Sequence, residues 1–278
     1  MFVGGGGGVE SLLGTKRAGI MREPGSERGL ALEKRASIPA DLLEAANQLL
    51  ERVDEQEIAV KFLGGLAFKL ICPSSAEGSL SRDNNDIDLA VRRKDVSKLK
   101  KLMETMGYEY PLRSNALHPD QILYVDNQNK RQVDIFVDGF QMCHKLDFRH
   151  GLEDEGPTLP ITELLMTKLQ IAEITDKDLR DIGAALFDFE IGSGKHDIHD
   201  AQITNITSTN WGVWKDFTGN LMKLKNRITK LAPDKAEVIA LSADSLLGLI
   251  AARPKSARWQ IRARIGERMQ WHELPQQR

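Results

Sequence analysis

Three aspartates have the types and spacing that metal-dependent phosphate chemistry needs. Asp86 and Asp88 lie two residues apart in a β-prone run. Because side chains alternate along a strand, both carboxylates are predicted to point to one face of a sheet. Carboxylates this close repel each other unless a cation lies between them, and Mg²⁺ prefers such oxygen ligands. Asp134, between Val133 and Ile135 in a later β-prone run, is predicted to add a third carboxylate on the same side.

A glycine pair and an arginine could hold the phosphates of the substrate. Gly64 and Gly65 lie between a β-prone run and a predicted helix. Glycine lets backbone N–H groups approach a phosphate closely, and a helix N-terminus favours anions. Arg82, four residues before Asp86, could donate a charge-assisted hydrogen bond to a phosphate oxygen. Each feature alone is more often a turn or a solvated edge, so the prediction depends on their order between residues 58 and 138.

The elements that must position these residues follow from apolar periodicity. Helices flanking a mixed sheet, the α+β class, are predicted for the first part, and a mainly helical region is predicted from Ile161 onward. In chain order the predicted elements are a helix capped by Ser37, a strand at 58–63, a helix at 66–71, a polar loop at 73–85, a strand at 86–92, a helix capped by Asp95 and ended by Gly107, and a hairpin of 121–125 with 131–137.

Taken together, these motifs resemble the nucleotidyltransferase superfamily related to DNA polymerase beta. A second resemblance, to abortive-infection-type nucleotidyltransferases, comes from the helical segments; that group includes the toxins of type IV toxin–antitoxin systems and their bacterial relatives. The resemblance covers residues 58–186 and fades beyond them. The matching segments are 62–67, Arg82 with 85–89, and 133–136 for the superfamily, and 164–169 with 176–182 for the abortive-infection type.

The resemblance implies a role for each matching residue. Metal binding is implied for three carboxylates, with the third also helping to activate the attacking hydroxyl: Asp86, Asp88 and Asp134. Nucleotide binding is implied for six residues: Gly64, Gly65, Arg82, Lys168, Lys177 and Asp181. Lys177 and Asp181 lie one helical turn apart, so they could shape the nucleotide pocket or simply pair with each other.

The sequence departs from the family pattern directly behind the glycine pair. Family members often have Ser or Thr there, whereas this chain has Leu66 and Ala67. A hydroxyl contact to phosphate is then either missing or supplied from elsewhere, with Ser79 and Ser81 as the candidates.

The implied activity is transfer of a nucleoside monophosphate from a nucleoside triphosphate to an acceptor hydroxyl. Two Mg²⁺ ions are the implied cofactors, and Mn²⁺ could substitute for them. A tRNA end, a protein side chain and a small molecule stay open as acceptors, and a cognate antitoxin is an implied partner. The alternative is a non-catalytic module that binds nucleotide or antitoxin and keeps the fold. The preferred nucleotide and the oligomeric state stay open.

Composition limits the remaining possibilities. The net charge of −2 gives no global basic field that would recruit nucleic acid, so any such contact must be local. One local candidate is the basic run 253–268, otherwise a solvated helix face. Two cysteines suit a reducing cytoplasm, and no apolar run approaches the about 20 residues of a membrane helix. The predicted organisation is a disordered glycine-rich leader at 1–36, a nucleotidyltransferase core at 37–150 and a helical region at 151–278.

Overall fold

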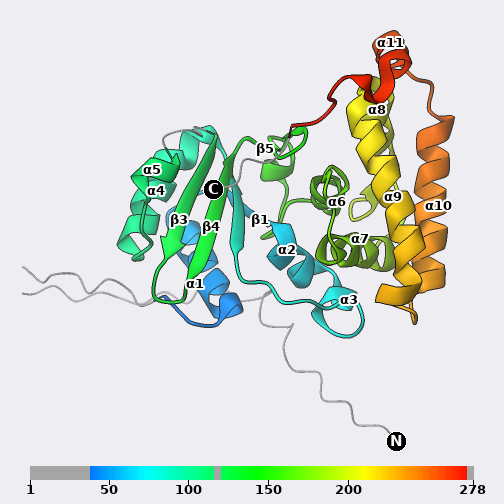
Figure 1. Ribbon diagram of the computed structural model, residues 1–278. Coiled ribbons are helices and arrows are strands. Elements are labelled where there is room, and N and C mark those ends of the chain that lie inside the picture. The colour runs from blue at the N-terminus through cyan, green and yellow to red at the C-terminus, as the bar shows by residue number, and fades with distance from the viewer. Residues whose placement is uncertain (1–37, 116–119, 274–278) are drawn as a thin grey trace, which may run out of the picture. The chain divides into compact units, whose positions relative to one another are not determined.

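The computed structural model describes residues 38–115 and 120–273. Its central feature is a four-stranded sheet in the order β1-β2-β4-β3 (Figure 1). The strands are β1 (Val60–Leu63), β2 (Ile87–Val91), β3 (Gln121–Asp126) and β4 (Arg131–Val137). β2 and β4 are parallel, while β1 and β3 pair antiparallel with their neighbours. The predicted mixed sheet and the predicted hairpin of the last two strands are both confirmed.

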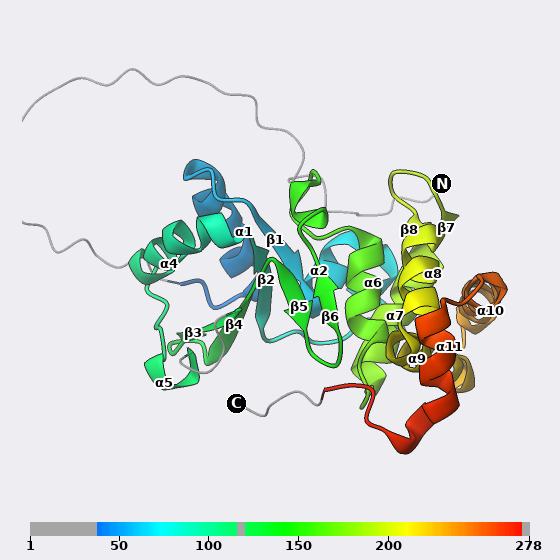
Figure 2. The same ribbon diagram turned by 90° about the horizontal axis from the view of Figure 1, so that it is seen from above.

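Helices cover both faces of this sheet. Figures 1 and 2 place α1 (Leu42–Glu55) and α4 (Val96–Thr105) on one side, and α2 (Gly64–Ile71) with the later helices on the other. The cap of α1 differs from the prediction, because Ser37 lies outside the described residues and Asp41 is the N-cap. The Asp41 Oδ1 atom accepts hydrogen bonds from the backbone N–H groups of Leu43 and Glu44, which satisfies two donors of the first turn.

Two further local predictions need correction. The polar loop at 73–85 contains a short helix, α3 (Pro73–Ala76), which is held because the backbone N–H and hydroxyl of Ser74 both donate to Asp188. Asp95 does precede α4, but its side chain makes no capping hydrogen bond. A 3-10 turn at Arg93–Asp95 leads into the helix instead.

From Ile161 onward the chain is mainly helical, as predicted. The longest element is α9, and Asn220 on it donates side-chain hydrogen bonds to the carbonyls of Leu169 and Ile171, which ties it to the end of α6. The helices are α6 (Ile161–Leu169), α7 (Asp176–Asp188), α8 (Asp200–Thr209), α9 (Trp211–Leu231), α10 (Ala236–Ala252) and α11 (Ala257–Ile265). The basic run at 253–268 includes α11, none of whose residues is buried.

Short elements complete the described part of the chain. They are α5 (Leu112–Asn115), the hairpin β5 (Gly139–Gln141) with β6 (Lys145–Asp147), and the parallel pair β7 (Ile191–Gly192) with β8 (Ile198–His199).

One continuous hydrophobic core joins the sheet to the helices that follow it. It includes Phe62 and Leu89 of the sheet, Leu164 of α6, and Leu224 and Leu246 of the last long helices. No helix among the described residues is both long and apolar enough to span a membrane. The predicted leader at 1–36 lies outside the described residues.

Candidate active site

Asp88 and Asp134 lie next to each other on adjacent parallel strands. They are direct partners in the β2–β4 register, so both side chains project from the same face of the sheet. Asp88 is partly buried. Burial, and after it the nearby carboxylates of Asp134 and Asp86, raise its pKa to about 7, although Lys168 and Arg82 oppose the rise. The ionised form of Asp88 is therefore unfavourable in the protein alone, as expected where a cation is needed to balance carboxylates.

Asp86 lies two residues before Asp88, at the end of β2 that is nearest to solvent. It is exposed, directly before β2 begins. Its Oδ1 atom accepts a long hydrogen bond, 3.4 Å, from the backbone N–H of Gln132 on β4. The three predicted carboxylates thus follow two adjacent strands, with Asp86 nearest to solvent.

Gln121 on β3 is a member of this site that the sequence did not reveal. Its side-chain Nε2 donates to Asp134 Oδ1 at 3.0 Å. Gln121 lies beside β4 only because of the β3–β4 register, in which it is the partner of Phe136. In the sequence, Gln121 is only a polar residue at the start of a predicted strand. Its contact with Asp134 cannot be predicted without knowing how β3 pairs with β4.

The glycine pair lies directly against these acidic and basic side chains. Gly64 has φ +66°, and a Cβ atom there would be 1.9 Å from Asp88 Oδ2. A Cβ on Gly65 would be 2.0 Å from Arg82 Nη2 and 2.1 Å from Asn84 Oδ1. Gly64 therefore requires glycine, and a side chain at Gly65 would displace Arg82 and Asn84. The N-terminus of α2 thus contacts the carboxylate site. Asn84 is a second polar neighbour that the sequence did not single out.

Four charged side chains form a largely buried cluster beside Asp88, here called the ion cluster: Arg82, Lys168, Asp178 and Asp181. Arg82 donates from Nε to Asp181 Oδ1 at 2.8 Å and from Nη2 to Asp181 Oδ2 at 2.6 Å. Lys168 Nζ lies 2.8 Å from Asp178 Oδ1 and 3.0 Å from Asp181 Oδ2. All four side chains are at most 15% exposed. The resemblance to abortive-infection-type enzymes did not single out Asp178.

The structure shows the contacts of three other residues for which the sequence left alternatives. Lys177 is exposed and does not pair with Asp181, whose carboxylate binds the two cations of the ion cluster. Ser79 donates its hydroxyl to Asp234 Oδ1 at 2.6 Å, and Ser81 donates to the carbonyl of Ala76 at 3.2 Å. Neither serine hydroxyl is therefore directed to the glycine pair, which favours the alternative that this hydroxyl contact is missing.

The carboxylates suit a hard divalent cation. Their donors are oxygens, two of them lie in register, and the raised pKa of Asp88 shows that negative charge there is poorly balanced. No group of three or more acidic, histidine or cysteine side chains among the described residues is arranged to hold a metal by itself. Asp86, Asp88 and Asp134 therefore do not form a complete ligand set, and Mg²⁺ bound through one or two of them would need water and substrate phosphates to complete its shell.

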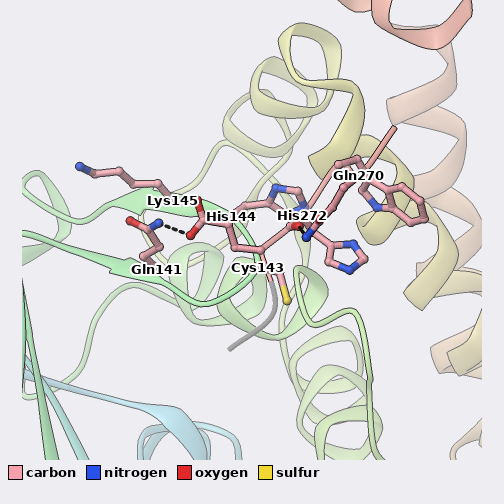
Figure 3. Close-up of a pocket in the computed structure, with 8 residues that line it drawn as sticks. Gln141, Cys143, His144, Lys145, Gln270 and His272 are labelled. Carbon is pink, nitrogen blue, oxygen red and sulfur yellow. Dashed lines mark hydrogen bonds between the residues drawn. The ribbon is translucent and has the colours of Figure 1, made fainter. Parts of the chain in front are cut away.

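A pocket of about 680 Å³ lies elsewhere, between the β5–β6 hairpin and the C-terminal segment (Figure 3). His144, which has no supporting motif in the sequence, lines it and bonds Asp216 Oδ2 through Nε2 at 2.7 Å. Trp271 donates to the other oxygen of Asp216 at 3.0 Å. Gln141 donates to Glu273 at 2.6 Å, as drawn in Figure 3. These polar groups mainly fasten the C-terminal segment to the hairpin.

Comparisons with known proteins find a matching family and similar solved structures. Residues 33–180, more than half of the 278-residue chain, match a family described as uncharacterised nucleotidyltransferases. No curated protein matches the sequence. Among solved structures, the antibiotic-resistance factor ANT(2'')-Ia is 12% identical, with a TM-score of 0.30. JHP933 from Helicobacter pylori is 14% identical, with a TM-score of 0.38. Each similarity covers 74% of this chain and 92% of the other.

Proposed function

Because this chain belongs to the family of uncharacterised nucleotidyltransferases, we propose that it transfers a nucleoside monophosphate from a nucleoside triphosphate to an acceptor hydroxyl. The acceptor oxygen forms a bond to the α-phosphorus, the bond from that phosphorus to the bridging oxygen breaks, and pyrophosphate leaves. The observation that carries the proposal is the in-register pair Asp88–Asp134 with Gly64 packed against Asp88.

We propose two Mg²⁺ ions as cofactors, with Mn²⁺ able to replace them. Bound ions would neutralise the triphosphate and lower the pKa of the attacking hydroxyl. Asp86 and Asp88 would hold them, and Asp134 would hold the second ion and draw the proton from the acceptor hydroxyl. Gln121 donates to one oxygen of Asp134, and this hydrogen bond would help to orient the carboxylate.

The remaining site residues would bind and orient the nucleotide. The backbone N–H groups of Gly64 and Gly65 begin α2 and would cradle the phosphates. Arg82 and Lys168 are the cations nearest to Asp88 that oppose its raised pKa, so they would contact phosphate oxygens on the metal side. Lys177 is exposed on α7, and its proposed role is a contact at the edge of the nucleotide pocket.

The acceptor and the biological role are proposed from the resemblance of 164–169 and 176–182 to abortive-infection-type enzymes. A tRNA end or a protein side chain would be the acceptor, and a cognate antitoxin would be the partner of a toxin-like protein. Both cysteines are free and buried, which suits the reducing cytoplasm that we propose as the location.

A second candidate function has one observation in its favour. Leu66 and Ala67 are buried, and the hydroxyls of Ser79 and Ser81 are bonded elsewhere. The hydroxyl that family members often place behind the glycine pair is therefore not replaced by these serines. A module that binds nucleotide without transferring it would tolerate this loss.

The deciding experiment uses each nucleoside triphosphate labelled at its α-phosphorus. The purified protein is incubated with the nucleotide, Mg²⁺ and either total RNA or a protein extract, beside the Asp86→Ala/Asp88→Ala double variant. Label on RNA or on protein with the wild type alone is the expected result and identifies the acceptor class. Metal-dependent nucleotide binding without any transfer of label would favour the binding module and exclude the transferase.

A further inference from the structure

We propose that Asp181 is a positioning residue, which holds Arg82 and Lys168 beside the metal-binding carboxylates instead of touching the nucleotide itself. This inference rests on the proposed function. The side chain of Asp181 is 2% exposed, and its two oxygens are bonded by Arg82 at 2.8 and 2.6 Å and approached by Lys168 at 3.0 Å. A carboxylate enclosed in this way has no surface left for a ligand.

The geometry of the Arg82–Asp181 pair favours positioning over simple charge neutralisation. Two parallel N–H···O bonds from one guanidinium to one carboxylate fix the plane of the arginine as well as its distance. The remaining guanidinium nitrogen, Nη1, donates to the carbonyl of Asp83 at 3.1 Å. Arg82 is therefore oriented from two sides, by α7 and by its own loop.

Asp181 also allows two positive side chains, Arg82 and Lys168, to lie close together in the ion cluster. Arg82 and Lys168 repel each other, and burial lowers the pKa of Lys168, but Asp181 and Asp178 outweigh both effects and hold that pKa above its usual value. The ion cluster has two positive and two negative side chains, so it is balanced. Without the charge of Asp181, Asp178 would be the one carboxylate of the ion cluster that balances the two cations, and separation of the cations would relieve their repulsion.

This arrangement links three distant parts of the chain at the reaction site. Arg82 comes from the segment before β2, Lys168 from α6 and Asp181 from α7. Both cations are close enough to Asp88 to lower its pKa. A shift of the Asp181 carboxylate would therefore move both cations relative to Asp88 and Asp134, and a displacement of about 1 Å in a reacting assembly can cost about 100-fold in rate.

Asp181→Asn and Asp181→Glu test the proposal. Asparagine keeps the shape and loses the charge, while glutamate keeps the charge and moves it outward by one methylene group. The matched control is Asp176→Asn on the same helix, because Asp176 forms only an exposed ion pair with Arg227. Nucleotide binding with Mg²⁺ and the kinetics of transfer are measured for ATP, GTP, CTP and UTP.

The expected results separate positioning from mere support of the fold. Asp181→Asn should lower kcat/KM by about 100-fold, with the loss shared between a higher nucleotide KM and a lower kcat. Asp181→Glu should recover about tenfold of that loss, and Asp176→Asn should match the wild type. A purely structural role would reduce the active fraction, so kcat would fall while KM stayed unchanged.

The pH dependence gives an independent readout. Lys168 faces Asp178 and Asp181 on α7, Arg82 on the loop and Asp88 on β2. Its raised pKa keeps the lysine charged across the usual assay range, so the wild type should keep its activity as the pH rises toward 10. In Asp181→Asn the pKa of Lys168 should fall, and the activity should decline at lower pH. In Asp181→Glu the alkaline limb should stay at the wild-type position.

Each outcome bears on one of the two proposals. If the wild type neither binds any of the four nucleotides with Mg²⁺ nor transfers label, the proposed function fails. If the wild type is active and Asp181→Asn has wild-type KM, kcat and alkaline limb, the positioning role is overturned. If Asp181→Asn does not fold, Asp181→Glu decides, because wild-type kinetics in that variant would contradict the requirement for a fixed carboxylate position.

Discussion

Replacement of Asp88 by asparagine should stabilise the metal-free protein while it removes activity. The pKa of Asp88 is about 7 in the folded protein against an ordinary 3.8, because of burial first and of Asp134 and Asp86 next. Between these two values the unfolded chain has released the proton while the folded chain still holds it. The free energy of unfolding therefore falls as the pH rises from about 4 to about 7 and stays low above that.

The magnitude follows from the shift. A rise of about three units corresponds to about 4 kcal/mol at most. Asp88 keeps some contact with solvent, so about half of this is a more realistic figure. Asp88→Asn should then exceed the wild type in unfolding free energy by about 1 kcal/mol at pH 5 and by about 2 kcal/mol at pH 8. At pH 8 this corresponds to a Tm higher by about 4–8 °C.

Thermal unfolding in EDTA between pH 5 and pH 8 measures this difference. Asp83→Asn is the matched control, because Asp83 belongs to the same segment and is exposed. Mg²⁺ added at pH 8 should raise the Tm of the wild type and leave that of Asp88→Asn unchanged, because a ligand stabilises only the state that binds it. An Asp88→Asn variant that melts at or below the wild type at pH 8 would refute the reasoning.

Three further predictions use the same geometry. Gly64→Ala should lose transfer activity and at least about 1 kcal/mol of unfolding free energy, because its Cβ would collide with Asp88. The control Gly248→Ala has open space around the new Cβ, so its unfolding free energy, measured by chemical denaturation, should rise by up to about 1 kcal/mol. Gln121→Ala should weaken Mg²⁺ affinity by about tenfold or more in titration calorimetry, because Asp134 loses a hydrogen bond that orients it. Nucleoside triphosphate binding should disappear in EDTA, since the ion cluster is already balanced and the three aspartates repel phosphate; tight binding without a divalent cation would contradict this.

The sequence was sufficient for the features that depend on alternation along a strand. Asp88 and Asp134 each lie between apolar residues. Because the apolar face of a strand must be buried, the pattern predicts that both carboxylates project from the opposite face. The hairpin of β3 and β4 was predictable because a short turn, residues 126–130, joins two β-prone runs. Which strands are neighbours did not follow from alternation. The parallel β2–β4 register brings the two carboxylates together, and here the order of the motifs indicated the pairing.

The sequence was insufficient where partners come from distant elements. Lys177 and Asp181 are one helical turn apart, which makes a local pair one of the two alternatives, yet Asp181 binds Arg82 and Lys168 instead. A solvent-exposed pair at this spacing contributes only about 0.2–0.5 kcal/mol. Two buried cations interact with a carboxylate far more strongly in a less polarisable environment, and leaving them unpaired would be costly. The tertiary contact is therefore stronger than the local pair, and residue spacing within one helix cannot predict it.

The ion cluster also indicates how much of the chain the site needs. A core ending at residue 150 would contain Arg82 but neither Lys168 nor Asp181, so the arginine would lose both of its strongest bonds. It would also expose apolar side chains, because one hydrophobic core runs from Leu89 in the sheet to Leu164 in α6 and beyond. The family match itself continues through α6 to residue 180, next to Asp181. The helices α6 and α7 therefore belong to the candidate active site, since they supply half of its cations and the carboxylate that holds both.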